Sequence, residues 1–116
     1  MLSLPSQLIL RNIELFSSGH WALVNPTDSE IFAELREYNL TGLHQFHDVY
    51  SQSENTSKFQ QVFAPSFNLE QLKRNTPLDG AIIYLPKAKQ QLEMLIANLV
   101  EMIADGGQLL IVGENK

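Results

Sequence analysis

Two different hydrophobic patterns follow one another in the last third of the chain. Residues 81–85 form a short apolar run with two β-branched residues and a tyrosine, which is typical of a strand buried on both faces of a sheet. After Pro86 the apolar residues recur at steps of three and four, which predicts an amphipathic helix. The apolar stripe of this helix comprises Ala88, Leu92, Leu95, Ile96, Leu99 and Ile103. Gly106 and Gly107 permit the positive φ of a helix end, and residues 109–112 predict a second buried strand, so the segment predicts a β-α-β unit.

The upstream residues predict the other elements of the same domain. We expect helices at residues 3–16, 28–38 and 69–74, strands at residues 20–24, 40–46 and 58–64, and a polar loop at residues 51–57. The second helix is expected to begin with a capping box formed by Thr27 and Glu30. Its inward side chains are Ile31, Phe32, Leu35 and Tyr38. Five strands and four helices predict a small α/β, Rossmann-like domain with a mostly parallel sheet flanked by helices.

Length and composition fit one domain that folds without covalent staples. The 116 residues are 44% hydrophobic and include no cysteine, which excludes disulfides and thiolate metal sites. The first residues lack a basic signal-type segment, and no apolar run approaches the roughly 18 residues of a membrane span. We therefore expect a cytoplasmic protein with no membrane partner.

The charge balance argues against autonomous binding to nucleic acid. Thirteen acidic and eight basic side chains give a formal net charge of −5, the wrong sign for a domain that grips a phosphate backbone by itself. Basic residues cluster only at Lys73 with Arg74 and at Lys87 with Lys89. The plain interpretation of these clusters is a solvated surface.

The strand ends and the helix of the C-terminal segment resemble a known family. Residues 84–89 (YLPKAK), the leucine-rich helix and residues 111–116 (IVGENK) resemble the amino-terminal half of the ribosomal RNA small subunit methyltransferase C family, the 16S rRNA guanine-N2 methyltransferases. The resemblance covers roughly the last 40 residues. It implies two methyltransferase-like domains in tandem, of which only the second binds S-adenosylmethionine and carries the catalytic Asn-Pro-Pro motif. Residues 1–116 would then be a single methyltransferase-like N-terminal domain, without a cofactor of its own, truncated from a longer two-domain protein.

The same resemblance implies the partners of the chain. These are the catalytic C-terminal domain of the same polypeptide and, through the full-length protein, the 16S rRNA of the small ribosomal subunit. Contacts with RNA or with the other domain are expected at Lys87, Lys89, Asn115 and Lys116.

The turn after the first strand predicts a closed donor site. In methyltransferases and dinucleotide enzymes this turn is rich in glycine, so that the backbone can approach the cofactor. Here residues 24–29 contain no glycine, Pro26 removes an N–H, and the side chains of Thr27 and Asp28 take up space. If this strand corresponds to the first methyltransferase strand, the donor site is blocked.

No catalytic motif is visible either. The Asn25-Pro26 pair lacks the second proline and the aromatic residue of an amino-methyltransferase loop, so we interpret it as a plain turn. The strand that ends at residue 85 is followed by Pro86-Lys87 and no asparagine. We expect this chain alone to be inactive and to contain no catalytic residue.

Two other groups of residues suggest chemistry but have simpler explanations. His44, His47 and Asp48 could suggest a metal site, but strand positions three apart face opposite sides and the HExxH pattern is absent, so we expect polar residues at a strand end. Four aromatic residues could suggest a platform for base stacking, but no basic residues are interleaved with them, so we expect core packing. The four are Tyr50, Phe59, Phe63 and Phe67.

Three functions of different classes remain open. The chain could be a non-catalytic domain that stabilises and positions a catalytic domain and aids the presentation of rRNA. It could bind a nucleotide or methyl donor as an enzyme in its own right. It could also be a free-standing module that associates with itself or with another protein through its sheet edge. The missing glycine-rich turn and the missing catalytic loop favour the first function.

Overall fold

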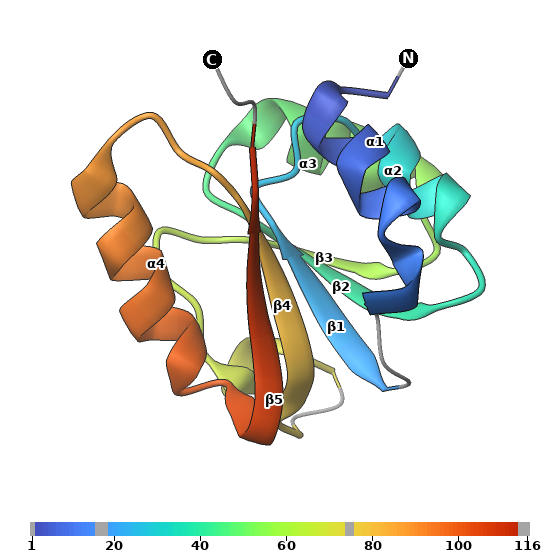
Figure 1. Cartoon of the computed structure of the whole chain (residues 1–116). Helices are drawn as coiled ribbons and strands as arrows, with labels where there is room; N and C mark the ends of the chain where they lie inside the picture. The colour runs from blue at the N-terminus through green and yellow to red at the C-terminus, as the bar shows by residue number, and fades with distance from the viewer. Residues whose placement is uncertain (1, 16–18, 74–75, 114–116) are drawn as a thin grey trace.

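The strands form one parallel sheet in the computed structural model, which describes residues 2–15, 19–73 and 76–113 (Figure 1). The strands are β1 (His20–Val24), β2 (Asn39–His44), β3 (Gln60–Phe63), β4 (Leu78–Tyr84) and β5 (Ile103–Val112). They lie in the order β3-β2-β1-β4-β5, and every neighbouring pair is parallel. The predicted Rossmann-like fold, its mostly parallel sheet and its five strands are confirmed.

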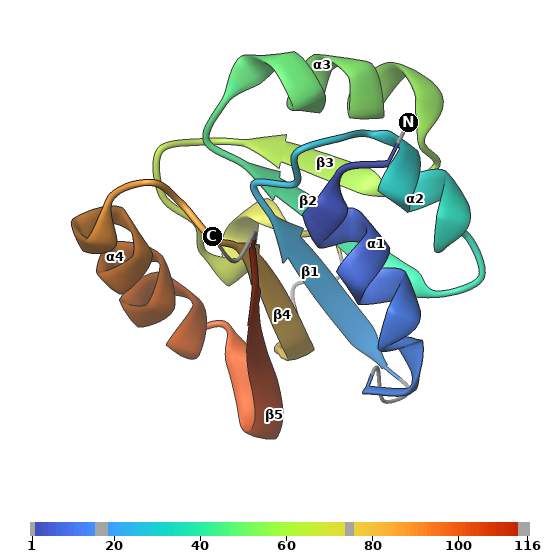
Figure 2. The same ribbon diagram turned by 45° about the horizontal axis from the view of Figure 1, so that its top comes forward.

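Helices cover both faces of this sheet. On one face lie α1 (Leu4–Arg11), the 3-10 turn η1 (Ile13–Leu15), α2 (Glu30–Glu34) and α3 (His47–Thr56), and on the other lie the 3-10 turn η2 (Leu69–Gln71) and α4 (Lys89–Val100). Figure 2 shows α3 beside α1 and α2, with α4 on the opposite side of the sheet. Among the described residues, no helix is long and apolar enough to cross a lipid bilayer.

The two covered faces explain why residues 21–24 of β1 and residues 80–84 of β4 carry no charged side chain and are buried throughout. Trp21 and Leu23 face the α1 and α2 side, whereas Ala22 and Val24 face the α4 side, and all four are at most 2% exposed. Parallel strands that are buried on both faces carry continuous hydrophobic runs. This is why the predicted bounds of β1 match the observed ones.

One predicted loop is wrong, because residues 51–57 belong largely to α3 (His47–Thr56). The sequence shows no apolar stripe there, and Ser53 is the buried residue of the helix. The helix instead packs on the sheet through aromatic rings: Tyr50 lies 5.7 Å from His44 and 5.3 Å from Phe63, measured between ring centroids. With α3 between β2 and β3, these two strands become parallel neighbours.

The start of α2 also differs from the prediction. The helix spans Glu30–Glu34 rather than residues 28–38, although Ile31, Phe32 and Leu35 are buried as expected. The capping box of Thr27 and Glu30 is wrong. The Asp28 carboxylate instead accepts the hydrogen bond from the Ile31 N–H at 2.9 Å.

The chain after α4 departs from the prediction as well. The helix ends at Val100, and Ile103 already pairs with Leu78 as part of β5, rather than extending the helical stripe. Gly106 has the expected positive φ of +83°, but it lies inside β5, where the pairing with β4 shifts register. The predicted strand at residues 109–112 is the second half of this longer β5.

Smaller differences concern element ends. The strands predicted at residues 40–46 and 58–64 begin and end one or two residues away, at Asn39–His44 and Gln60–Phe63. The helix predicted at residues 69–74 is the turn η2, with the capping box of Asn68 and Gln71 formed in both directions. The helix predicted at residues 3–16 is divided between α1 and η1, and residue 16 lies outside the described part.

Candidate functional site

The carboxyl ends of the strands face upwards in Figure 1. A hollow of about 540 Å³ lies at the carboxyl ends of β1, β2 and β4. The chain runs from β1 outwards to β2 and β3 and then crosses back to β4, so neighbouring β1 and β4 leave the sheet in opposite directions. Open α/β sheets bind ligands at such a switch point, outside the carboxyl ends of the strands. The walls of the hollow come from the loops after β1, β2 and β4 and from the first turns of α3 and α4.

The loop after β1 is shaped by Asn25. Its φ of +54° lies in the left-handed region, which asparagine tolerates better than most residues, and its backbone N–H donates to the carbonyl of Leu43 at 2.8 Å. Pro26 follows and is buried, whereas Thr27 is exposed and donates to Ser3 Oγ at 2.6 Å. The loop therefore turns sharply without glycine.

Gln45 connects four segments at the carboxyl edge of the sheet. Its backbone N–H donates to Asn25 Oδ1 at 2.7 Å, and its Oε1 accepts from Asn25 Nδ2 at 2.9 Å and from Gln91 Nε2 at 3.0 Å. Its Nε2 donates to the carbonyl of Pro65 at 2.9 Å. The loops after β1, β2 and β3 and the first turn of α4 are thus tied together by one side chain.

A second network joins α1 to the same edge of the sheet. Asp28 Oδ2 accepts from the Ser3 N–H at 3.0 Å, from Ser3 Oγ at 2.8 Å and from Ser6 Oγ at 2.7 Å. Because Ser6 directs its proton to Asp28, the Tyr84 hydroxyl donates to Ser6 Oγ at 2.6 Å. The end of β4 is therefore linked through α1 to the loop after β1.

Both ionisable groups of this network respond to their surroundings. Burial acts to raise the pKa of Asp28, but the hydrogen bonds from Ser6, Ser3 and Ile31 outweigh it and hold the pKa below its ordinary value. Burial raises the pKa of the Tyr84 hydroxyl well above its ordinary value. Asp28 is thus held as an anion and Tyr84 as a neutral donor, and the two cannot exchange a proton readily.

The rim of the hollow is formed by exposed side chains, whereas Pro26, His44 and Tyr84, which also line the hollow, are buried. Phe46 is 62% exposed and Leu85 is 50% exposed, and both line the hollow. Asp48, from the first turn of α3, and Lys87, from the loop between β4 and α4, are exposed on the same rim. An aromatic ring, an anion and a cation thus surround one opening.

Of the contact residues expected from the sequence, the structure describes two. Lys87 lines the hollow, and Lys89 is the first residue of α4 and is exposed. Asn115 and Lys116 lie outside the described residues.

The histidines are separated by the fold. His44 is buried and donates from Nε2 to Gln61 Oε1 at 2.6 Å, whereas His47 is exposed, with its ring 5.5 Å from that of Phe63. His20 lies at the other edge of the sheet. Within residues 2–15, 19–73 and 76–113, no three His, Asp or Glu side chains are grouped to hold a metal ion.

The aromatic residues considered in the sequence do not share one environment. Phe67 is buried in the core on the α4 side of the sheet, and Phe59 packs against the core on the opposite face, as expected. Phe63 is 48% exposed and stacks on Tyr50 at the outer edge of the sheet. No sequence pattern singles out Phe46, the aromatic side chain on the rim of the hollow. Its position two residues after β2 is nevertheless a signal, because ligands bind outside the carboxyl ends of parallel strands.

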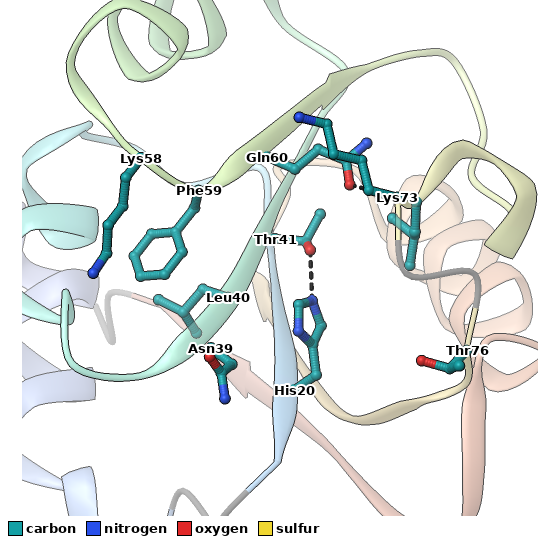
Figure 3. Close-up of a pocket in the computed structure, with 10 residues that line it drawn as sticks. His20, Asn39, Leu40, Thr41, Lys58, Phe59, Gln60, Lys73 and Thr76 are labelled. Atoms are coloured by element: carbon teal, nitrogen blue, oxygen red, sulfur yellow. Dashed lines mark hydrogen bonds between the residues drawn. The ribbon is translucent and has the colours of Figure 1, made fainter.

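A smaller hollow of about 200 Å³ lies at the amino ends of β1, β2 and β3 (Figure 3). There His20 Nε2 is 2.6 Å from Thr41 Oγ1, and Gln60 Oε1 accepts from the Lys73 N–H at 2.8 Å. Two pairs of its polar groups thus bond each other. It lies at the edge opposite to the one at which α/β sheets bind ligands.

The strand order and the switch-point hollow define a Rossmann-like domain of the methyltransferase type, and comparisons with solved structures agree. The glycopeptide N-methyltransferase MtfA superposes with a TM-score of 0.69 at 15% identity, over 92% of this chain and 52% of that one. Streptomyces venezuelae DesVI gives a TM-score of 0.58 at 13% identity, over 91% of this chain and 46% of that one. Identities this low show a shared fold.

Sequence comparisons identify the family. The model of the family described as "Methyltransferase small domain N-terminal" matches residues 6–116, and the chain belongs to this family. It is 45% identical over its whole length to ribosomal RNA small subunit methyltransferase C of Pseudoalteromonas atlantica and 31% identical to the protein of that name from Alteromonas mediterranea. It spans 34% and 37% of these two relatives, so the match is to their N-terminal part and the relatives are about three times as long.

Proposed function

We propose that this chain is the non-catalytic N-terminal domain of a 16S rRNA (guanine-N2) methyltransferase, which acts in the cytoplasm, where ribosomes are. In this proposal it stabilises and positions the S-adenosylmethionine-dependent catalytic domain of the same polypeptide and aids the presentation of rRNA. Membership of the N-terminal family and the length of the relatives support this role.

The loop after β1 is the observation that carries the non-catalytic part of the proposal. In the fold of methyltransferases the donor approaches the backbone at this turn and at the start of the next helix. Here Pro26 has no N–H to offer, the Ile31 N–H is taken by Asp28, and Thr27 is fixed by Ser3. The residues present therefore do not fit the methionine end of S-adenosylmethionine, and we assign no cofactor to this domain.

The loop after β4 supports the same conclusion. An amino-methyltransferase needs hydrogen-bond acceptors that hold the target nitrogen at this point. This chain has Leu85, which is half exposed, followed by Pro86 and Lys87, none of which has a side chain that can accept a hydrogen bond. The neighbouring Tyr84 hydroxyl is buried and bonded to Ser6. No side chain of Leu85, Pro86 or Lys87 can therefore hold a target amine by accepting its hydrogen bond.

A calorimetric titration of the chain with S-adenosylmethionine tests the proposal. We expect no saturable heat up to about millimolar donor, the concentration that corresponds to roughly 4 kcal/mol of binding free energy. The matched control is the full-length protein, in which the catalytic domain should give a saturable isotherm. Saturable binding by the 116-residue chain would disprove the donor-free role.

The positioning role requires a surface for the rest of the polypeptide, and the open side of β5 supports one. β5 is an edge strand, and a hollow of about 290 Å³ lies between it and α1, lined by Leu8, Ile82 and Leu110 among others. Ile111 is 48% exposed and Leu8 is 36% exposed beside it. We assign this face to the remaining polypeptide. A Leu8→Glu change in the full-length protein should lower the melting temperature of the catalytic domain and leave the fold of the isolated chain intact.

The same face supports one second candidate, a free-standing module that associates with itself. Edge strands with exposed apolar residues pair readily with other chains. Light scattering with size-exclusion chromatography separates the candidates: a dimer that Leu8→Glu abolishes, together with a full-length protein unaffected by that change, would favour the module.

A further inference from the structure

The hollow at the carboxyl edge is lined by two kinds of polar group: partly or fully buried groups that have hydrogen-bond partners in the protein, and exposed charged groups that have none among the described residues. Asn25 and Gln91 line the hollow and each donate to Gln45, and Tyr84, which also lines it, bonds Ser6 through its hydroxyl. These groups already have their partners and do not need a ligand. Recognition of a ligand therefore depends on the exposed residues around the opening of the hollow.

The charged groups on the rim have no partner in the protein. Within the described residues, none bonds the carboxylate of Asp48 or the ammonium of Lys87, although both line the hollow. A carboxylate can only accept hydrogen bonds and an ammonium can only donate them. Together they suit a ligand that presents N–H donors at one end and an anion at the other.

The apolar residues of the rim favour a ligand of a particular shape. Phe46 leaves 62% of its side chain in water, more than the other large hydrophobic residues found exposed in the described structure. Leu85 and Val49 complete an apolar wall around the same hollow. Such a surface favours a flat aromatic ligand, because exposed aromatic side chains stack unpaired bases.

We propose that this hollow holds one unstacked nucleobase of single-stranded RNA. The base lies against Phe46, its N–H edge donates to Asp48, and the adjoining phosphate lies near Lys87. The volume of about 540 Å³ is in the range that holds a ligand of nucleotide size. This inference rests on the proposed function for the source of the ligand, an RNA, and deepens it by naming the contact.

The chemistry of the rim also predicts which base binds. Guanine carries two adjacent N–H groups on its Watson–Crick edge and can donate both to one carboxylate, whereas adenine offers its amino group alone. RNA with guanine at the bound position should therefore bind more tightly than RNA with adenine there, and Asp48→Asn should reduce that difference.

The charge of the domain sets how the RNA is held. A net charge of −5 leaves little attraction for the phosphate backbone, and Lys87 is the basic residue that lines the hollow. With one or two phosphates neutralised, log affinity should fall with log salt at a slope of about −1, far less than for a phosphate-binding protein. Stacking rather than charge should supply most of the affinity.

A nuclear magnetic resonance titration of the ¹⁵N-labelled 116-residue chain tests the inference. The probes are a pentanucleotide RNA with a central guanine, the same RNA with a central abasic site, and S-adenosylmethionine. We expect the first RNA to shift the amides of residues 46–49 and 85–91 in a saturable manner and the abasic RNA to bind about tenfold more weakly.

Two phenylalanine variants provide the matched comparison. Phe46→Ala should weaken binding of the guanine RNA about tenfold, because it removes the stacking surface. Phe63→Ala removes a second exposed ring, on β3 and outside the hollow, and should leave binding unchanged. Because Phe46 is exposed, its variant should keep the dispersed spectrum of the folded chain.

Each other outcome overturns the inference. Equal binding by the two phenylalanine variants, equal binding of the abasic RNA, or no saturable shift with RNA would each show that no base occupies the hollow. If S-adenosylmethionine also causes no saturable chemical-shift change in that case, the proposed non-catalytic role still stands. Saturable binding of S-adenosylmethionine that competes with the RNA would instead make the hollow a donor site and overturn both proposals.

Discussion

Asn25 and Gln45 exchange two hydrogen bonds across the carboxyl edge of the sheet. Asn25 Oδ1 accepts from the Gln45 backbone N–H at 2.7 Å, and Asn25 Nδ2 donates to Gln45 Oε1 at 2.9 Å. The asparagine holds a φ of +54° while it makes these bonds. At the turn where methyltransferases use glycine to let a cofactor approach, this chain thus has a residue that both adopts the left-handed backbone and locks the turn to its neighbour.

We expect Asn25→Ala to destabilise the fold by about 2 to 4 kcal/mol. The change removes two hydrogen bonds, worth about 1 kcal/mol each, and leaves a residue that pays about 1 to 2 kcal/mol for a left-handed conformation. Asn25→Gly should recover the backbone part and fall between the alanine variant and the wild type. Urea unfolding followed by circular dichroism measures the three free energies, and equal losses in both variants would show that φ contributes nothing.

Methyl transfer separates this structural role from a catalytic one. In the full-length protein, Asn25→Ala should leave the rate of RNA methylation per folded molecule essentially unchanged, because we place the donor in the other domain. The rate is measured at a temperature where circular dichroism shows the variant folded. A folded variant without activity would mean that Asn25 takes part in the reaction.

Leu99→Ala should cost about 2 to 5 kcal/mol of unfolding free energy. Leu99 belongs to α4 and is fully buried in the core, so its truncation leaves a cavity as well as losing apolar burial. Leu95→Ala, one turn earlier and 1% exposed, should behave alike. Met94→Ala is the control on the same helix: Met94 is 60% exposed, and its variant should stay within about 0.5 kcal/mol of the wild type. Comparable losses for Met94 and Leu99 would contradict the assigned helix face.

Gly80→Ala should destabilise the sheet by about 1 to 3 kcal/mol, because a Cβ at this position would lie 2.6 Å from two atoms of the Trp21 ring. Trp21 is 2% exposed and has little room to move. A double-mutant cycle with Trp21→Phe tests the cause: the smaller ring should reduce the cost of Gly80→Ala. Additive losses would place the strain elsewhere.

The strands could be predicted from the sequence because burial on both faces leaves a direct mark on composition. β1 was predicted at its observed bounds for this reason, and β4 and β5 in their second halves. The helix α3 could not, since it meets the sheet through Tyr50 and presents polar residues elsewhere, which is also the pattern of a loop. The spacing of apolar residues shows which face of a helix is buried, so a helix that buries few apolar side chains cannot be recognised from this spacing.

The candidate site was harder to predict than the fold. The absence of glycine after β1 leads to the prediction of a closed donor site, but the bonds from Gln45 to Asn25, Gln91 and the Pro65 carbonyl depend on four segments meeting in space and cannot be predicted from it. The place of Phe46 on the rim of the hollow cannot be predicted from the sequence for a related reason. Its importance comes from the strand order, which brings the end of β2 close to the loop after β4, and no local pattern encodes that order.

His44 gives the stability of the fold a dependence on pH in the mildly acidic range. Burial lowers the pKa of His44 below its ordinary 6.5, and the hydrogen bond to Gln61 offsets this only in part. Between the folded pKa and 6.5 the unfolded chain therefore binds more protons than the folded one, so stability rises with pH in this window. The contribution is complete above about pH 6.5 and is lost as the pH falls below it, until the folded pKa is reached. Urea unfolding between about pH 8 and pH 5 should show this decline, and His44→Gln, which cannot be protonated, should flatten it. Parallel curves for the wild type and the variant would mean that another group causes the pH dependence.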